Sequence, residues 1–249
     1  MNLTPEDLKR YGWQLDVPGF GEEGQRKLKG ATVLITRCGG VGGTAALELA
    51  AAGVGHIILA HAGDLRLDDL NRQLLMTTDH VGKPRIESAA RRLAELNPTI
   101  RVTTLNENAS PENAERLVGM ADAVIDAAPL FEERFALNAA CVAAKKPLIE
   151  AAMFAMEFTL TTIVPGVTSC LACLFPSKPE WWRRRFPVFG AVAGTVGCLA
   201  AMEAIKLLTG IGRPLVGTML RGDVGAQEFR RIAVHRLPGC AVCDPKSGD

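Results

Sequence analysis

The most constraining stretch of the sequence is residues 32–60, in which two apolar runs flank a glycine-rich turn and an alanine-rich segment. The first run, Thr32–Thr36, leads into Arg37-Cys38-Gly39-Gly40-Val41-Gly42-Gly43, and the second run is His56–Ala60. Strand, glycine turn, helix and strand at this spacing indicate a βαβ nucleotide-binding unit, because glycines let backbone N–H groups approach a phosphate. The candidate phosphate-binding glycines are Gly39, Gly40 and Gly42.

Two positions of this unit depart from the pattern of a dinucleotide-binding site. Such a site has a glycine directly after the first strand and an acidic residue at the end of the second strand, which binds the ribose. Here the first position is Arg37, and the second strand ends in Ala60-His61. These departures argue against a nicotinamide-dependent oxidoreductase. They leave open that the glycines only allow the helix to pack closely on the strand.

The composition is that of an ordinary globular chain. Its 249 residues, 48% hydrophobic and 22% charged, suffice for a sizeable core. A net charge of +1 and an aromatic content of 5% argue against nucleic acid or an anionic membrane as a partner. The N-terminus predicts a helix capped by Thr4 and Asp7 rather than a signal peptide, so we expect a cytoplasmic protein. Residues 186–208 contain Glu203 and Lys206 and predict a buried helix rather than a membrane span.

Helical and extended stretches alternate along the chain. After two short helices at 4–12 and 21–29 and the βαβ unit, we expect strands at 101–105, 123–126 and 147–150 and helices at 85–97, 111–120 and 131–144. This alternation predicts an α/β fold with a doubly wound, Rossmann-like, mostly parallel sheet and helices on both faces. Extended stretches at 154–164, 215–221 and 229–235 predict an antiparallel C-terminal extension. We expect one domain over residues 1–249, with a nucleotide-binding half at 20–150 and the extension at 151–243.

The seven cysteines fall into two sets. Two Cys-x-x-Cys pairs provide four thiolates, the ligand set that a tetrahedral structural zinc prefers; they are Cys170, Cys173, Cys240 and Cys243. We expect this closed site to tie the C-terminal segment to the strand region, with a redox role for one pair as the lesser alternative. The other three lie among apolar or small residues and are expected to be buried; they are Cys38, Cys141 and Cys198.

A polar cluster, Asp68-Asp69-Leu70-Asn71-Arg72-Gln73, follows the second strand. A loop at this point is expected to lie over the carboxyl ends of the strands, where open α/β sheets bind their ligands. Arg72 is the candidate phosphate-binding residue of this loop, and an exposed structural arginine is the alternative of equal weight.

Several motifs together resemble the MoeB/ThiF/HesA family, which comprises bacterial relatives of ubiquitin-activating enzymes. Besides the glycine turn and the paired Cys-x-x-Cys, they are Asn71-Arg72-Gln73, Val81-Gly82-Lys83-Pro84, Leu96-Asn97-Pro98 and Ala201-Met202-Glu203-Ala204-Ile205-Lys206. The resemblance runs from Arg10-Tyr11 to Pro238-Gly239-Cys240 and implies a dimer, typically a homodimer, with a structural zinc. It also implies the use of ATP and magnesium to adenylate the C-terminal glycine of a small ubiquitin-like sulfur carrier.

The resemblance assigns site residues where the motifs match. The matching positions are Gly39, Gly40, Gly42, Arg72 and Gln73. Four positions differ from what the resemblance implies. Trp13 stands where the family has an arginine that reaches across the dimer, and His61 stands where it has an aspartate that binds the ribose. Arg85 stands in place of a lysine that binds the phosphates, and Pro129 stands in place of an aspartate that supports magnesium. The candidate catalytic residues are Arg72 and Arg85, and the candidate cofactor-binding residues are Gly39, Gly40, Gly42, Arg37, His61, Arg72, Gln73, Lys83 and Arg85.

These four differences favour a protein that keeps the fold to bind a sulfur carrier or an active paralogue, with ATP-dependent adenylation lost or altered. The alternative is a working adenylyltransferase. Its positive charge would come from Arg37, Arg72, Lys83 and Arg85, and its metal ligand from Asp64, Asp68 or Asp69. The stretch Trp181–Arg185 stands where some family members carry a reactive cysteine, and it is expected either to dock an acidic partner or to be a solvated loop.

Overall fold

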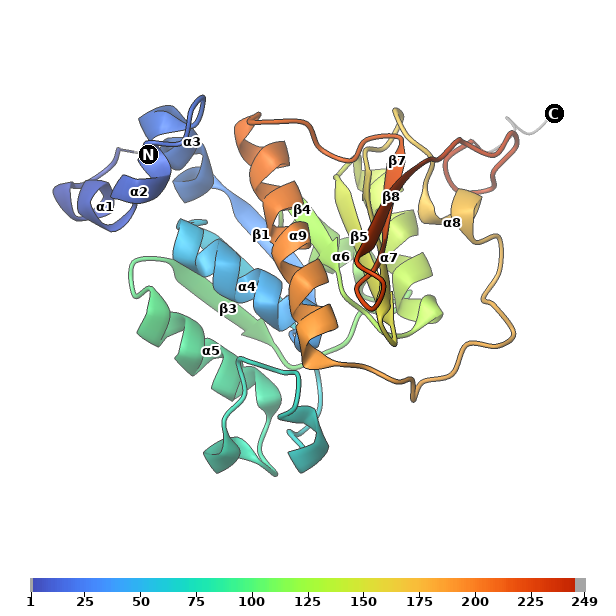
Figure 1. Ribbon diagram of the computed structural model, residues 1–249, viewed down its shortest axis with the longest axis horizontal. Helices are drawn as coiled ribbons and strands as arrows, with labels where there is room; N and C mark the ends of the chain where they lie inside the picture. Colours follow the sequence, from blue (N-terminus) through green and yellow to red (C-terminus); the bar gives the residue numbers. More distant parts are fainter. Residues whose placement is uncertain (1, 245–249) are drawn as a thin grey trace.

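The computed structural model describes residues 2–244, which fold around one eight-stranded sheet (Figure 1). The strand order is β3-β2-β1-β4-β5-β6-β7-β8. Strands β1 to β5 run parallel, and β5 to β8 pair antiparallel. The strands are β1 (Thr32–Thr36), β2 (His56–Ala60), β3 (Arg101–Leu105), β4 (Ala123–Asp126), β5 (Leu148–Phe154), β6 (Glu157–Ile163), β7 (Thr218–Asp223) and β8 (Glu228–Ala233).

Two hydrophobic cores lie on the two faces of the sheet, because side chains alternate along each strand. In β1, Val33 and Ile35 belong to the first core and Leu34 to the second. The first core is covered by α3 (Gly21–Gly30), α4 (Gly40–Ala52), α5 (Arg85–Leu96) and α9 (Gly190–Thr209). The second is covered by α6 (Ala114–Gly119), α7 (Phe131–Ala144) and α8 (Leu171–Leu174). The predicted parallel sheet with helices on both faces is confirmed.

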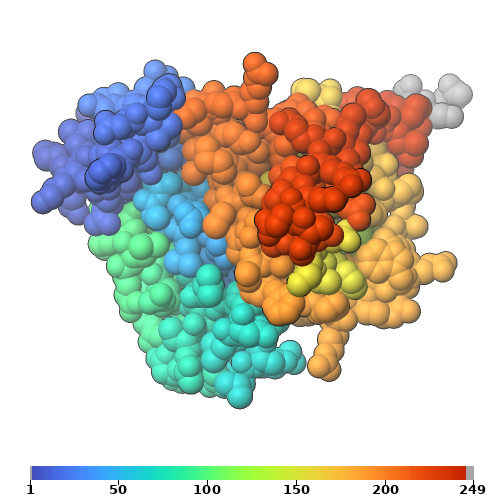
Figure 2. All heavy atoms as spheres, in the orientation of Figure 1, coloured from blue at the N-terminus to red at the C-terminus, as the bar shows by residue number. Residues whose placement is uncertain are grey.

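The N-terminal segment packs at one end of the molecule, and the C-terminal strands lie at the other (Figure 2). The N-terminal segment comprises the short helices α1 (Pro5–Arg10) and α2 (Gly12–Leu15). Thr4 and Asp7 form the predicted capping box of α1. Two short 3₁₀ helices, η1 (Leu67–Asp69) and η2 (Thr78–His80), lie in the loop between β2 and α5.

Most of the predicted elements of the first half occur at the expected residues, namely the strands at 32–36, 56–60, 101–105 and 123–126 and the helix at 131–144. The antiparallel extension is also confirmed. Strand β5 runs on to Phe154 rather than ending at Glu150, because it pairs with β6 along its whole length.

The long apolar helix α9 begins at Gly190 rather than at Phe186. The residues before it are extended, since Val188 pairs with Ala155 and the carbonyl of Pro187 accepts a hydrogen bond from the Ala155 N–H. Within residues 2–244, α9 is the one helix long and apolar enough for a membrane span by length and composition. It packs here against α4, β5 and β6 as a core helix, as the sequence predicted.

Two smaller predictions are wrong. Cys198 on α9 is exposed rather than buried, with its Sγ 3.8 Å from the carboxylate of Glu48 on α4. The spacing of Ile86, Ala90, Leu93 and Leu96 predicts one apolar face of α5, but Leu96, the last residue of the helix, is 41% exposed, and the buried face includes Ala89. Neither difference affects the layout of the sheet.

The close contact of α4 with α9 depends on Gly197. A Cβ atom at this position would lie 2.6 Å from the carbonyl oxygen of Val41 and 2.7 Å from Cβ of Thr44. We expect Gly197→Ala to lower the free energy of unfolding by about 1–3 kcal/mol through overpacking. Chemical denaturation measures this.

The matched control is Gly194→Ala on the same helix, where the nearest atom to a new Cβ is Thr44 Oγ1 at 3.9 Å. That variant should be neutral or more stable by up to about 1 kcal/mol, because alanine favours helix. Equal effects of the two substitutions would contradict a tight contact at Gly197.

Candidate anion-binding site

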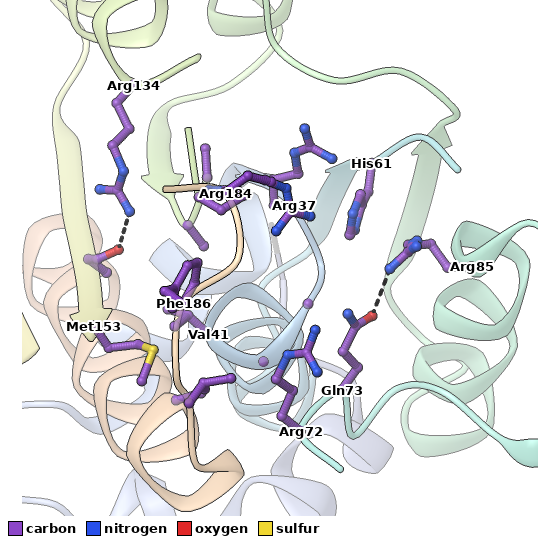
Figure 3. A pocket seen from close by; sticks show the side chains of 18 of the residues that line it. Arg37, Val41, His61, Arg72, Gln73, Arg85, Arg134, Met153, Arg184 and Phe186 are labelled. Carbon is purple, nitrogen blue, oxygen red and sulfur yellow. Dashed lines mark hydrogen bonds between the residues drawn. The ribbon is translucent and has the colours of Figure 1, made fainter. Parts of the chain in front are cut away.

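The candidate site lies at the carboxyl ends of the parallel strands, between β1 and β4, where the strand order reverses. A cleft of about 1060 Å³ opens there, which we call the basic cleft because six arginines line it: Arg37, Arg66, Arg72, Arg85, Arg184 and Arg185. It adjoins a smaller inner pocket of about 100 Å³, lined among others by Gly39, Gly40, Pro129, Arg134, Met153 and Trp182. Figure 3 shows Arg37, Arg72, Arg85 and Arg184 reaching in from different elements around His61.

The glycine turn combines a packing role with an open site. A Cβ atom at Gly40 would lie 2.8 Å from Cβ of Ala193 on α9, and one at Gly42 would overlap the carbonyl oxygen of Arg37. A Cβ at Gly39 would meet nothing closer than 3.7 Å. Close packing therefore accounts for Gly40 and Gly42, while Gly39 faces the inner pocket at the N-terminus of the 13-residue helix α4.

Asp69 holds the floor of the basic cleft together. Its carboxylate is buried and accepts hydrogen bonds from Arg72 Nη2 at 3.0 Å, Gln73 Nε2 at 2.8 Å and Arg85 Nη1 at 3.2 Å. The backbone N–H of Arg66 donates a fourth at 3.1 Å. Asp69 therefore orients the predicted residues Arg72, Gln73 and Arg85, and its oxygens are already occupied by these donors.

Arg37 lines both the cleft and the inner pocket while forming a bidentate ion pair with Glu133 of α7. The Nε–Oε2 distance is 2.7 Å, and both side chains are largely buried. Arg37 also adopts a left-handed backbone conformation, with φ of 66°. The bulky cation predicted in the turn is thus fixed at the wall of the site, with Glu133 balancing its charge.

His61 is buried at the end of β2, with Nδ1 3.5 Å from Sγ of Cys38. Burial, and after it the positive charges of Arg85, Arg37 and Arg184, hold the pKa of His61 well below its ordinary value. The imidazole is therefore neutral at pH 7. Burial also raises the pKa of the Cys38 thiol to about 12, so that this thiol stays protonated.

The remaining predicted residues lie partly outside the site. Lys83 lines neither cavity, because its ammonium group donates to the carbonyl of Asp79. Trp13 is 94% exposed on α2, and Asp64 lines neither cavity either. Asp68 lines the basic cleft and pairs with Arg66. A role of Lys83 in the site stays a prediction.

Sequence reasoning missed a group of buried charges beneath the inner pocket. Arg134 pairs with Glu150, and its Nη1 atom lies 4.0 Å from the carboxylate of Asp126. Burial raises the pKa of Asp126 and raises that of Glu150 to about 7, although Arg134 opposes both shifts. Among the described residues, Oδ2 of Asp126 has no hydrogen-bond partner. Two adjacent charged residues in a predicted helix, Glu133 and Arg134, were the only sign of this group in the sequence. Their partners could not be predicted, because they are distant in sequence.

The stretch Trp181–Arg185 is only in part the solvated loop considered from the sequence. Trp182 packs edge-to-face on Phe131, with ring centroids 5.6 Å apart, whereas Trp181 is 62% exposed. Both tryptophans line an aromatic pocket of about 220 Å³ together with Phe154, Phe158 and Phe175. This aromatic pocket shares Arg134, Met153 and Trp182 with the inner pocket, so the two cavities are neighbours.

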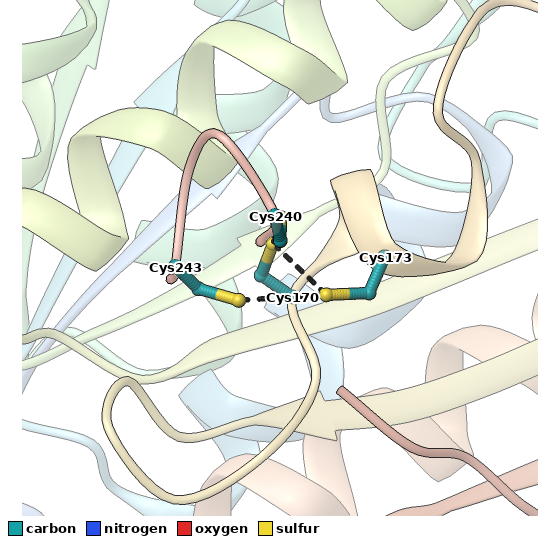
Figure 4. Close-up of side chains that lie close together, drawn as sticks. All are labelled: Cys170, Cys173, Cys240 and Cys243. Carbon is teal, nitrogen blue, oxygen red and sulfur yellow. Dashed lines mark hydrogen bonds between the residues drawn. The ribbon is translucent and has the colours of Figure 1, made fainter. Parts of the chain in front are cut away.

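The four paired cysteines converge, as predicted (Figure 4). Their sulfur atoms all lie within 4.8 Å of one another, with close pairs at 3.4, 3.8 and 3.9 Å. Four sulfurs bound to one tetrahedral zinc at about 2.3 Å would be about 3.8 Å apart. The cluster can therefore hold a metal ion and joins α8 to the C-terminal segment.

These features define a class: a doubly wound α/β protein with an arginine-lined cleft at the point where the strand order reverses. The model of the ThiF family matches residues 11–242, and the chain belongs to this family. It is 54% identical over 243 residues to "Protein HesA, heterocyst" of Trichormus variabilis, covering 98% of this chain and 91% of that protein.

Two further relatives are more distant. The chain is 38% identical over 250 residues to the sulfur carrier protein ThiS adenylyltransferase of Escherichia coli, covering 99% of each. Among solved structures, it resembles E. coli MccB with AMPCPP and selenomethionine MccA, with a TM-score of 0.86 and 28% identity over 97% of this chain and 75% of that one.

The raised pKa of Glu150 predicts a specific pH dependence. Because the folded state binds this proton more tightly than the unfolded chain, the contribution of Glu150 to stability is full below its unfolded pKa of about 4.5 and falls as the pH rises through about 7. We therefore compare the free energies of unfolding of the unmodified protein and of Glu150→Gln. The first minus the second should decline by up to about 3 kcal/mol from pH 4 to pH 8.

Urea denaturation of both proteins across this pH range measures the difference. The control is Glu157→Gln on β6, which removes a half-exposed carboxylate paired with exposed Arg221 and should change stability little. A difference for Glu150→Gln that does not change with pH would mean that this carboxyl titrates as an ordinary glutamate.

Proposed function

We propose that this chain binds a nucleoside triphosphate in the basic cleft and the C-terminal tail of a small ubiquitin-like sulfur carrier beside it, with the family's ATP-dependent adenylation lost or altered. The observation that carries the nucleotide part is the charge of the cleft, whose lining has six arginines against two aspartates. A polyphosphate chain offers several anionic oxygens to such a set of guanidinium groups, and guanidinium–phosphate hydrogen bonds are among the strong ones.

The altered chemistry follows from how the carboxylates are used. Magnesium prefers carboxylate and phosphate oxygens in octahedral geometry. Among the described residues lining the basic cleft, Asp69 is occupied by Arg72, Arg85 and Gln73, and Asp68 pairs with Arg66. Pro129 offers only a carbonyl, which accepts the indole N–H of Trp182 at 2.9 Å. Magnesium would thus be held mainly by the phosphates of the nucleotide.

A working adenylyltransferase is the second candidate, and the open position of Gly39 at the N-terminus of α4 favours it. The names of relatives point the same way, since one is a ThiS adenylyltransferase and another, MccB, has been solved with AMPCPP and MccA. In that case the arginines would supply the charge stabilisation of nucleotidyl transfer without a protein-held metal.

The partner would reach the nucleotide through the inner pocket. The aromatic pocket beside it offers an apolar surface to a polypeptide tail, and tryptophan and arginine are favoured interface anchors. We further propose that the protein is cytoplasmic and forms a dimer, with a second copy or with an active paralogue.

Calorimetric titration of ATP tests the nucleotide part. We expect binding both with magnesium and in EDTA, and Arg72→Ala should weaken it by about tenfold or more because a charge-assisted phosphate contact is lost. The control is Arg92→Ala on α5, an exposed arginine paired with Glu95 outside the cleft. Failure of ATP to bind the unmodified protein would refute nucleotide binding.

Pyrophosphate release distinguishes the two candidates. Purified protein is mixed with ATP, magnesium and a small carrier protein ending in Gly-Gly. Carrier binding without release supports the proposed function, whereas carrier-dependent release supports a working adenylyltransferase. Absence of carrier binding at any practical concentration would show that the partner is of another kind.

We propose that the cysteine cluster holds zinc. Replacing Cys240 and Cys243 by serine should release about one zinc per chain and loosen residues 160–244, because four thiolates are needed to close the site. Metal analysis and hydrogen exchange measure these effects. Replacing the exposed Cys198 by serine is the control, and an unchanged zinc content in the double variant would refute a structural zinc site.

A further inference from the structure

Four residues of the segment Trp181–Val188 line the inner pocket, and the segment is held on both sides of Arg184. On one side, the indole of Trp182 donates to the carbonyl of Pro129 at 2.9 Å and packs against Phe186 at a centroid distance of 5.3 Å. On the other side, the carbonyl of Pro187 accepts the N–H of Ala155 at 2.9 Å. The backbone that carries Arg184 is therefore held in place rather than free in solvent.

Arg184 reaches from this segment into the site. It lines both the inner pocket and the basic cleft, and Figure 3 shows its guanidinium group next to that of Arg37 and directed toward His61. Its neighbour Arg183 is different, because it donates to the carbonyls of Glu180 and Trp182 and lines neither cavity.

The charge of Arg184 is not balanced within residues 2–244. Arg37 is paired with Glu133, and Arg72 and Arg85 are paired with Asp69. Arg184 makes no ion pair or hydrogen bond with any described residue. Burial, and after it the positive charge of Arg37, lowers the pKa of Arg184. Glu133 opposes this shift, but its carboxylate is already paired with Arg37, and Arg66 and Arg72 add further positive charge, so a bound anion would relieve the repulsion.

We propose that Arg184 binds the β- and γ-phosphates of the nucleoside triphosphate in the basic cleft, so that Trp181–Val188 acts as a clamp over the polyphosphate within one chain. The clamp rests on the proposed nucleotide binding, and it assigns recognition of the phosphate chain to Arg184. Arg72 approaches from the opposite wall, which places guanidinium groups from two distant segments on one anion.

The size and the charge of the site favour a polyphosphate over a single carboxylate. One carboxylate can satisfy one bidentate guanidinium group. Arg37, Arg72 and Arg184 come from three separate segments and line a cleft of about 1060 Å³. A triphosphate has enough oxygens to contact several of these arginines at once.

Calorimetric titrations of ATP and AMP into the intact protein, in EDTA, test the assignment. Arg184→Ala should weaken ATP binding by about tenfold or more and change AMP binding by less than about threefold, because AMP lacks the two phosphates in question. Arg184→Lys should restore part of the loss, since lysine keeps the charge but not the fork of donors. Arg183→Ala, on the same segment, should bind both nucleotides as the unmodified protein does.

Limited trypsin digestion gives a second readout. Saturating ATP should slow cleavage after Arg183 and Arg185 in the unmodified protein, because the clamp is held against the ligand. The same protection should be absent in Arg184→Ala at an ATP concentration that saturates that variant. Mass spectrometry of the fragments identifies the bonds cut.

The outcomes separate two failures. If the unmodified protein binds ATP and Arg184→Ala binds it equally well, the clamp is refuted and nucleotide binding stands. Equal loss for ATP and AMP, or equal loss in Arg183→Ala, would also refute a specific contact with the terminal phosphates. If neither ATP nor tripolyphosphate binds the unmodified protein, both the clamp and the proposed nucleotide binding are refuted.

Discussion

The site depends on the buried carboxylate of Asp69, which is surrounded by donors from Arg66, Arg72, Gln73 and Arg85. A buried carboxylate is unfavourable unless its oxygens are hydrogen-bonded, and here four donors satisfy them. In return, the carboxylate fixes Arg72 and Arg85, whose long side chains would otherwise have many rotamers. The floor of the cleft is therefore arranged before any ligand arrives, so less side-chain ordering opposes binding.

Other arginines around the site are also paired with buried carboxylates. These pairs leave positive charge for a ligand only on the arginines that have no such partner. Arg37 is balanced by Glu133, and Arg134 by Glu150, both in buried or largely buried pairs. Removing one partner of such a pair would leave an uncompensated charge, so these arginines serve the fold as well as the site. Among the described residues that line the cleft, Arg184 and Arg185 have no such carboxylate partner. The excess charge thus lies on the segment that covers the site.

The sequence predicted those parts that depend on local pattern. The βαβ unit, the alternation of elements and the cysteine pairs are read from spacing, and the structure has them at the expected residues. Long-range pairing was not predictable: nothing near Arg37 in sequence indicates Glu133, and nothing near Trp182 indicates the carbonyl of Pro129. A motif match gives a residue's position in the chain but not the direction of its side chain, so the contact of the Lys83 ammonium group with the carbonyl of Asp79 was not predictable either. Nucleotide binding and the roles of the predicted residues remain predictions.

Pro129, in the loop between β4 and α7, links the absence of a metal ligand to the position of Arg184. A proline has no side-chain oxygen for a cation, but its carbonyl holds the indole of Trp182, which in turn fixes the backbone that presents Arg184. A carboxylate in the same place would add negative charge to the inner pocket, which Arg184 also lines, so that less net positive charge would face a ligand. Proline at 129 and arginine at 184 are thus mutually consistent. Together they favour direct recognition of an anion by guanidinium groups over recognition through a metal held by the protein.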